Sequence, residues 1–136
     1  MTMPDPMTLF DLGQRAMSAQ LVRMNAAASN LANAGSVAAT EEGAYLPLRP
    51  VFAEHLDAAS GLSSVQVDGV HRADVAPTRR HDPGHPLADA NGDVWVSPVD
   101  GNAEMVEMLE ASRQYQNMVE ALSTAKQLML ETMRMK

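Results

Sequence analysis

The 136-residue chain contains no cysteine, and aromatic residues make up only 4% of it. The absence of cysteine excludes disulfides, thiolate nucleophiles and cysteine-ligated zinc sites. The chain also lacks any apolar run of the roughly 18 residues that a membrane-spanning helix needs, so the sequence predicts no direct membrane insertion. Its 46% of hydrophobic residues nevertheless lies in the ordinary range for a chain that buries apolar surface.

The start of the sequence does not predict a cleavable secretory signal either. The first ten residues carry Asp5 and two prolines, and they contain no basic start followed by an apolar stretch. If the protein acts outside the cytoplasm, we therefore expect it to leave by a route that needs no such signal.

Negative charge is concentrated in the middle of the chain. The net charge is −7, and residues 36–100 hold ten acidic side chains against four basic ones, which leaves both ends close to neutral. Near-neutral helices can associate without strong mutual repulsion. An acidic chain is a poor partner for nucleic acid or for an anionic membrane surface, so we expect it to bind neither.

Apolar side chains recur at every seventh position near both ends of the chain. This spacing keeps side chains on one stripe of a helix, and two such stripes can pack together. The first row is Phe10, Met17, Met24 and Leu31, and the second is Met108, Tyr115, Leu122 and Met129. The two ends therefore predict helices that pack against each other or against neighbouring chains.

Local signals indicate where the first helix begins and ends. Thr8 and Asp11 have the spacing of a capping box, and Asn33-Ala34-Gly35 is typical of a helix terminus. Asn25, Asn30 and Asn33 leave two interpretations open. Either they are simply solvated, or they form hydrogen bonds that fix the register between helices.

The second helix is predicted to follow Pro98, with Asp100 or Asn102 as its cap, and to continue to about Met133. Its apolar stripe is wider than a two-helix seam needs, and the chain is rich in methionine, an adaptable packing residue. We expect helix packing and assembly to involve the following residues: Phe10, Met17, Leu21, Met24, Ala28, Asn30, Leu31, Asn33, Met105, Met108, Tyr115, Met118, Val119, Leu122 and Met129.

Residues 36–100 contain five of the eight glycines and six of the eight prolines. Short strands are predicted there at Tyr45–Phe52, Ser64–Val67 and Val94–Val96, with loops at His55–Ser63 and Arg79–Pro86. We expect a mainly α fold, in which long terminal helices (residues 1–35 and 101–136) pair as an antiparallel coiled-coil-like hairpin. The middle, residues 36–100, forms a small β-rich lobe with mobile loops.

No arrangement typical of catalysis or of a cofactor emerges. His81 and His85 are four residues apart, but Pro83 and Gly84 between them destroy the helical spacing that would suit zinc. Residues 89–93 resemble a calcium loop, yet the required glycine at its sixth position is Val94. We therefore expect no catalytic, cofactor-binding or metal-binding residues.

Four segments of the chain resemble one known family. Residues 25–34 (NAAASNLANA) are similar to the AASNLANA signature of flagellar rod, hook and hook-filament axial proteins. Residues 104–116 (EMVEMLEASRQYQ) resemble the EMV and ASRxYQ signature of that family. Residues 82–92 (DPGHPLADANG), residues 43–52 and the short length are most similar to its proximal rod members, whereas residues 53–75 match poorly.

The resemblance implies a structural subunit without catalysis. It implies terminal helices that lie side by side in a tubular rod, which crosses the periplasm and transmits torque for motility. The implied partners are other proximal and distal rod proteins, the adaptor between the MS ring and the rod, further copies of the chain, and the flagellar type III export apparatus in transit. The paired helices also fit a soluble adaptor or chaperone-like binding module, and a small metal hydrolase using His81 and His85 is a third hypothesis.

Overall fold

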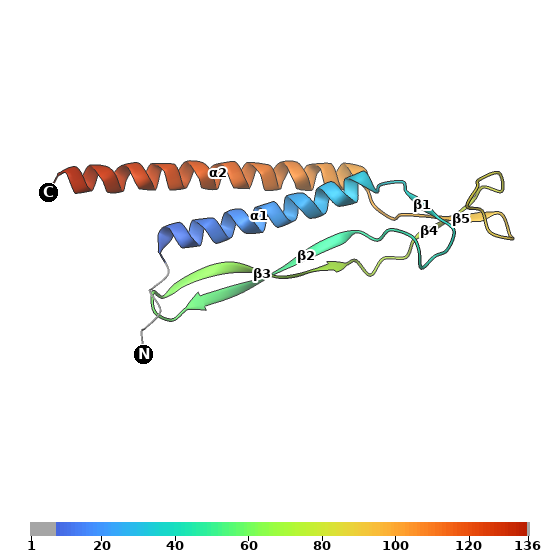
Figure 1. Ribbon diagram of the computed structural model, residues 1–136, viewed down its shortest axis with the longest axis horizontal. Helices are drawn as coiled ribbons and strands as arrows, with labels where there is room; N and C mark the ends of the chain where they lie inside the picture. The colour runs from blue at the N-terminus through green and yellow to red at the C-terminus, as the bar shows by residue number, and fades with distance from the viewer. Residues whose placement is uncertain (1–7, 136) are drawn as a thin grey trace.

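The computed structural model describes residues 8–135 and is strongly elongated (Figure 1). Two helices lie side by side, a two-stranded ribbon runs along the first of them, and a small sheet forms the far end. The elements in chain order are α1 (Leu9–Ala32), β1 (Val37–Ala38), β2 (Leu48–Asp57), β3 (Leu62–Arg72), β4 (Thr78–His81), β5 (Asp93–Val96) and α2 (Gly101–Arg134).

The predicted capping box at the start of α1 is confirmed. The Thr8 hydroxyl accepts a hydrogen bond from the Asp11 backbone N–H at 3.2 Å, and the Asp11 carboxylate accepts one from the Thr8 N–H at 3.0 Å. At the other end, the Asn33 backbone N–H donates to carbonyls of the last turn, and Gly35 takes a positive φ of 77°. Both signals read from the sequence therefore bound the helix.

The 34-residue helix α2 is capped by Asp100, whose side chain accepts from the backbone N–H groups of Asn102 and Ala103. It runs antiparallel to α1, because Gly13 faces Leu122 while Gly101 faces Leu31. The helices approach closely where Gly13 faces Leu122. Most of the residues that the helices bury are also small: Gly13, Ala19, Ala26 and Ala27 on α1 and Ala111 on α2.

The last turns of α2 extend past the start of α1 (Figure 1). Since Gly13 faces Leu122, the four residues of α1 that precede Gly13 reach only to about residue 126 of α2. We call residues 127–134 of α2 the overhang. All of its side chains are exposed.

Strands β2 and β3 form an antiparallel ribbon that pairs from Leu48↔Arg72 to Asp57↔Leu62, with a bulge after Val51. The ribbon packs along α1, where the Arg15 guanidinium donates to the Ser64 hydroxyl at 3.0 Å. Most ribbon side chains remain exposed. Its stability therefore depends on the backbone ladder and on the contact with α1 more than on a core of its own.

The second sheet has the order β1-β5-β4, with all neighbours antiparallel. Its centre is Val94, which is fully buried. Residues 82–92 connect β4 to β5 at the end of the molecule farthest from the overhang (Figure 1).

The prediction of a mainly α fold with a small lobe is wrong. The described residues are 45% helical and 24% strand, with two antiparallel sheets. The antiparallel pairing of the terminal helices is present, but the strands were predicted too short. The segment His55–Ser63, expected to be a loop, contributes the ends of both ribbon strands around a turn at residues 58–61, and the strand expected at Ser64–Val67 extends over Leu62–Arg72.

The physical reason is that the ribbon is exposed on most of both faces, so no sustained alternation of apolar and polar residues marks it. The predicted Arg79–Pro86 loop is likewise wrong at its start, because β4 already pairs with β5 there. Within residues 8–135, no helix combines the length and the apolar character that a membrane span requires.

Gly13→Leu should force α1 and α2 apart, because a Cβ at this position would lie 2.6 Å from the Leu122 Cδ2 atom. Overpacking of this kind costs about 1–3 kcal/mol of the free energy of unfolding. Adding Leu122→Ala should recover most of the loss, since the new leucine then fills the vacated space. Urea unfolding followed by circular dichroism measures both effects. If Gly13→Leu lowered the free energy of unfolding equally with and without Leu122→Ala, the close approach of Gly13 to Leu122 would be contradicted.

The start of α1 should be sensitive to acid. The pKa of Asp11 is lowered, chiefly by the hydrogen bond from the Thr8 backbone N–H. The ionised Asp11 carboxylate therefore stabilises the start of α1 above the ordinary pKa of 3.8, and this stabilisation is lost as the pH falls through the lowered pKa. The Leu12 amide, which donates to the Thr8 carbonyl, should lose protection from hydrogen exchange as the pH falls below the ordinary pKa of 3.8. In the Asp11→Asn variant, protection of the Leu12 amide should be low at every pH. If the variant kept the pH dependence of the wild type, the role of the Asp11 carboxylate would be refuted.

Candidate functional site at the junction of the helices and the ribbon

The histidines considered as zinc ligands have local partners. The His81 Nδ1 atom lies 3.0 Å from an Asp93 carboxylate oxygen across β4 and β5, and the His85 Nδ1 atom accepts from the Leu87 backbone N–H. The Asp89 carboxylate accepts from two backbone N–H groups of its own turn, which fits the hairpin interpretation of residues 89–93. Among residues 8–135, no cluster of three or more His, Asp or Glu side chains is arranged to hold a metal ion.

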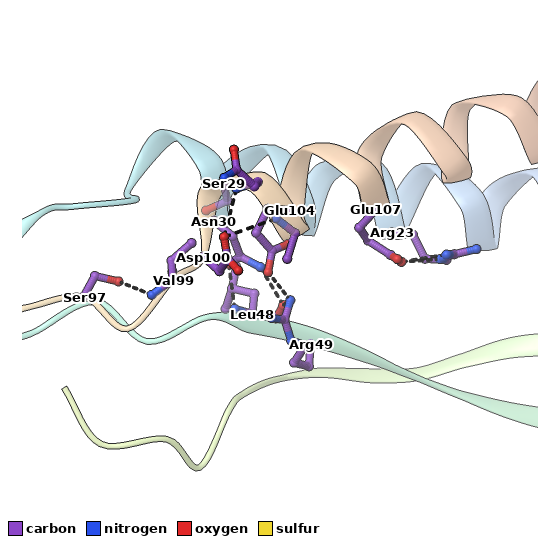
Figure 2. Close-up of polar contacts among 12 residues, drawn as sticks. Arg23, Ser29, Asn30, Leu48, Arg49, Ser97, Val99, Asp100, Glu104 and Glu107 are labelled. Carbon is purple, nitrogen blue, oxygen red and sulfur yellow. Dashed lines mark hydrogen bonds and ion pairs between the residues drawn. The ribbon is translucent and has the colours of Figure 1, made fainter. Parts of the chain in front are cut away.

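A connected group of polar side chains lies instead where the end of α1, the start of β2 and the start of α2 meet (Figure 2). We call this site the junction. Its members are Asn30, Tyr45, Leu48, Arg49 and Glu104. Its contacts are hydrogen bonds from side chains to a strand backbone and an ion pair between opposite charges. These contacts hold the helices and the ribbon together.

Asn30 is the centre of the junction and is fully buried. Its Oδ1 atom accepts from the Leu48 backbone N–H at 2.7 Å and from the Tyr45 hydroxyl at 2.8 Å, while its Nδ2 group donates to the Leu48 carbonyl at 3.0 Å. A single amide therefore satisfies both backbone groups of one strand residue, as a neighbouring strand would do. Of the two interpretations of Asn30, the structure supports hydrogen bonding, although to a strand rather than to the other helix.

Asn33 has a more local role. Its side-chain Nδ2 group donates to the Ser29 carbonyl one turn earlier, at 2.8 Å. The Ser29 hydroxyl in turn lies 2.9 Å from the Tyr45 hydroxyl, and the Arg72 guanidinium lies 5.4 Å from the centre of the Tyr45 ring. Tyr45 is thereby held between the helix end and the ribbon.

Glu104 fastens α2 to the same strand. Its side chain is only 2% exposed and forms an ion pair through Oε1 with Arg49 of β2 (Figure 2). One turn along α2, the Glu107 Oε1 atom pairs with the Arg23 guanidinium of α1 at 2.7 Å. The two acidic residues thus connect α2 to both of its neighbours.

The structure places the residues predicted for helix packing in three groups. Asn30 is buried, and Asn33 is partly buried. Every member of the two rows except Met129 is partly buried, and so is Met118; the set is Phe10, Met17, Met24, Leu31, Met108, Tyr115, Met118 and Leu122. The remaining residues are exposed: Leu21, Ala28, Met105, Val119 and Met129.

Sequence reasoning missed Tyr45, Arg49 and Glu104 as junction residues. One signal was available for Glu104, because it lies seven residues before Ala111 and therefore on the same stripe of α2, where Ala111 is fully buried. No comparable periodicity marks Arg49, whose role depends on where the ribbon crosses the helices.

The matched segments of known families coincide with the paired helices. The family model described as "Flagella basal body rod protein" matches residues 10–37, and "Flagellar basal body rod FlgEFG protein C-terminal" matches residues 90–135. The flagellar basal-body rod protein FlgC of Salmonella typhimurium is 42% identical over 129 residues, which covers 93% of this chain and 95% of the relative. FlgC proteins of Yersinia enterocolitica and Escherichia coli O157:H7 are 41% and 39% identical over the same shares.

The two terminal helices pair with each other, and the junction holds them to the ribbon. Both helices match family models of rod proteins, so the chain is a flagellar basal-body rod protein. The similarity extends along almost the whole chain and not only along the helices. The chain belongs to the FlgC family of rod proteins. It is thus a structural subunit of the rod in the bacterial flagellar basal body.

Asn30→Ala should destabilise the fold by about 1–3 kcal/mol for each backbone group of Leu48 that is left buried without a partner. Asn25→Ala, an exposed asparagine on the same helix, is the matched control and should change little. Urea unfolding of the two variants measures the difference. Because alanine has a higher helix propensity than asparagine, the helix itself should lose no stability in either variant. Similar losses in both variants would refute the role of the junction.

Proposed function

We propose that this rod subunit assembles through the outward faces of its paired helices. The observation that carries the proposal is the apolar surface that pairing leaves uncovered. Several large apolar side chains of α2 are exposed, among them Met105, Val106, Leu109 and Val119. Large apolar side chains left exposed along one helix are typical of protein interaction sites. The exposed members of the predicted packing set would then contact neighbouring subunits, while the partly buried members hold the helix pair together.

The overhang contributes the clearest part of this surface. Leu128, Met129 and Met133 are 59%, 52% and 70% exposed, and no turn of α1 lies opposite them. Eight residues of helix extend for roughly 12 Å. We propose that a helix of an adjacent subunit covers this stretch in the rod.

The wider assignment follows from the family. As a rod subunit the chain assembles with other flagellar rod proteins. More specifically, we propose proximal and distal rod subunits, the adaptor between the MS ring and the rod, and further copies of the chain as its partners. We also propose export through the flagellar type III apparatus and a position in the part of the rod that crosses the periplasm.

We propose no catalytic activity and no cofactor, because the polar residues that converge in the fold are engaged in fastening its elements. A soluble adaptor or chaperone-like module is not favoured, since the relatives that match nearly the whole chain are rod proteins. The helices would carry assembly and torque, and residues 36–100 would support them and form the outer surface.

Deletion of the gene should abolish swimming and leave basal bodies without complete rods, and the wild-type gene should restore both. Leu128→Asp with Met133→Asp should fold normally but fail to restore rods, because charge on the overhang opposes burial against a neighbour. Gln127→Asp, an exposed polar position in the same overhang, is the matched control and should swim. Swimming in soft agar and electron microscopy of isolated basal bodies provide the readouts.

The outcomes separate two levels of the proposal. Normal swimming in the deletion strain would refute the rod function itself. Normal rods with the doubly charged overhang would refute only its role as a contact surface.

A further inference from the structure

Methionine thioethers form part of the apolar surface of the overhang. Met129 and Met133 are 52% and 70% exposed, and their spacing of four residues places them on the same side of α2. Leu130, which is also exposed, neighbours Met133 at a spacing of three. The surface that a neighbouring subunit would cover therefore contains two side chains that an oxidant can reach and convert into polar ones.

The other methionines of the helix pair are better shielded. Met17 and Met24 of α1 and Met108 and Met118 of α2 are all partly buried. Within α2, Met105 is the one further exposed methionine, and it lies at the opposite end of the helix. Because oxidation of a methionine follows its exposure, we expect the paired part of the helices to react slowly and the overhang to react early.

A sulfoxide on the overhang would oppose the proposed contact. Oxidation turns a flexible apolar side chain into a polar one, whose S=O oxygen needs a hydrogen-bond donor when it is buried. The apolar side chains of Leu128 and Leu130 in the same stretch have no donor to offer. Each sulfoxide that is buried against a neighbour without a partner should therefore weaken the contact by about tenfold.

We propose that Met129 and Met133 make the assembly of this subunit sensitive to peroxide. The unassembled chain is open to oxidation at these two side chains, and the sulfoxides keep it out of the rod. Once an unoxidised chain has been incorporated, a neighbouring subunit protects both sulfur atoms. The inference rests on the proposed function, because it requires that a neighbour covers the overhang.

The reaction needs hydrogen peroxide as its only co-reactant. A lone pair of the thioether sulfur attacks one peroxide oxygen, so that an S–O bond forms while the O–O bond breaks. The departing hydroxide takes the proton from the transferred oxygen and leaves as water. Sulfur loses two electrons, the peroxide gains them, and the product is the sulfoxide.

The first measurement compares the free chain with the assembled one. Trypsin cleaves after lysine and arginine, so it releases the overhang as the single peptide 127–134. Peptides 16–23 and 114–126 serve as references, because each carries one partly buried methionine. In the purified full chain treated with hydrogen peroxide, mass spectrometry should find sulfoxide forming at least about fivefold faster per methionine in peptide 127–134. In isolated basal bodies this difference should disappear.

The second measurement tests whether oxidation limits assembly. Met129→Leu with Met133→Leu keeps the overhang apolar and removes both thioethers. Rods per cell are counted in the complemented deletion strain after growth with and without a concentration of hydrogen peroxide that growth tolerates. Peroxide should lower this count at least about threefold more in the wild type than in the double variant. Met118→Leu removes a partly buried thioether and is the matched control, which should respond to peroxide as the wild type does.

An equal loss of rods to peroxide in the wild type and the double variant would overturn the proposal, and so would slow oxidation of peptide 127–134 in the free chain. If the double variant forms too few rods to count, the peptide comparison decides. If peptide 127–134 reacts as fast in basal bodies as in the free chain, the overhang is not covered, and the proposal falls together with that contact. Rods in the deletion strain would refute the rod function instead, which keeps the failures apart.

Discussion

The fold depends on one buried amide that acts in place of a third β-strand. A two-stranded ribbon is at best marginally stable in water, so β2 and β3 need support from elsewhere. Asn30 provides it by pairing with both backbone groups of Leu48. Because Asn30 lies in the last turns of α1, these bonds also fix where the ribbon starts and in which direction it runs along the helix (Figure 2).

Glu104 adds a second fastening from the other helix, so that the same short piece of β2 is held from both sides. Buried ion pairs contribute little net stability once the cost of desolvation is counted. The pair of Glu104 with Arg49 therefore serves mainly to specify geometry. Breaking one partner would leave the carboxylate buried and unpaired, which is much less favourable than removing both.

The features that could be predicted from the sequence are local or periodic ones. The seven-residue rows and the Thr8 and Asp11 capping box depend on neighbours along one helix, and the structure has both helices and, at the start of α1, the capping box. The ribbon could not be predicted to its full length, because Leu62–Arg72 buries only Ser64 and its order comes from backbone pairing with a distant segment.

The junction was only partly predictable for the same reason. Asn30 could be singled out as a polar residue on a helix of small side chains, but not its partner, because the partner is backbone. Glu104 was missed, although its position on the Ala111 stripe indicated burial.

The antiparallel pairing has a practical consequence for labelling this protein. Helix α1 begins and α2 ends at one end of the molecule, and the connection between β4 and β5 lies at the opposite end (Figure 1). A fluorescent tag at the C-terminus would therefore sit beside the exposed apolar turns of α2. A small epitope inserted near Gly84, whose absent Cβ would meet no other atom within 4 Å, would sit at the far tip and leave those turns free.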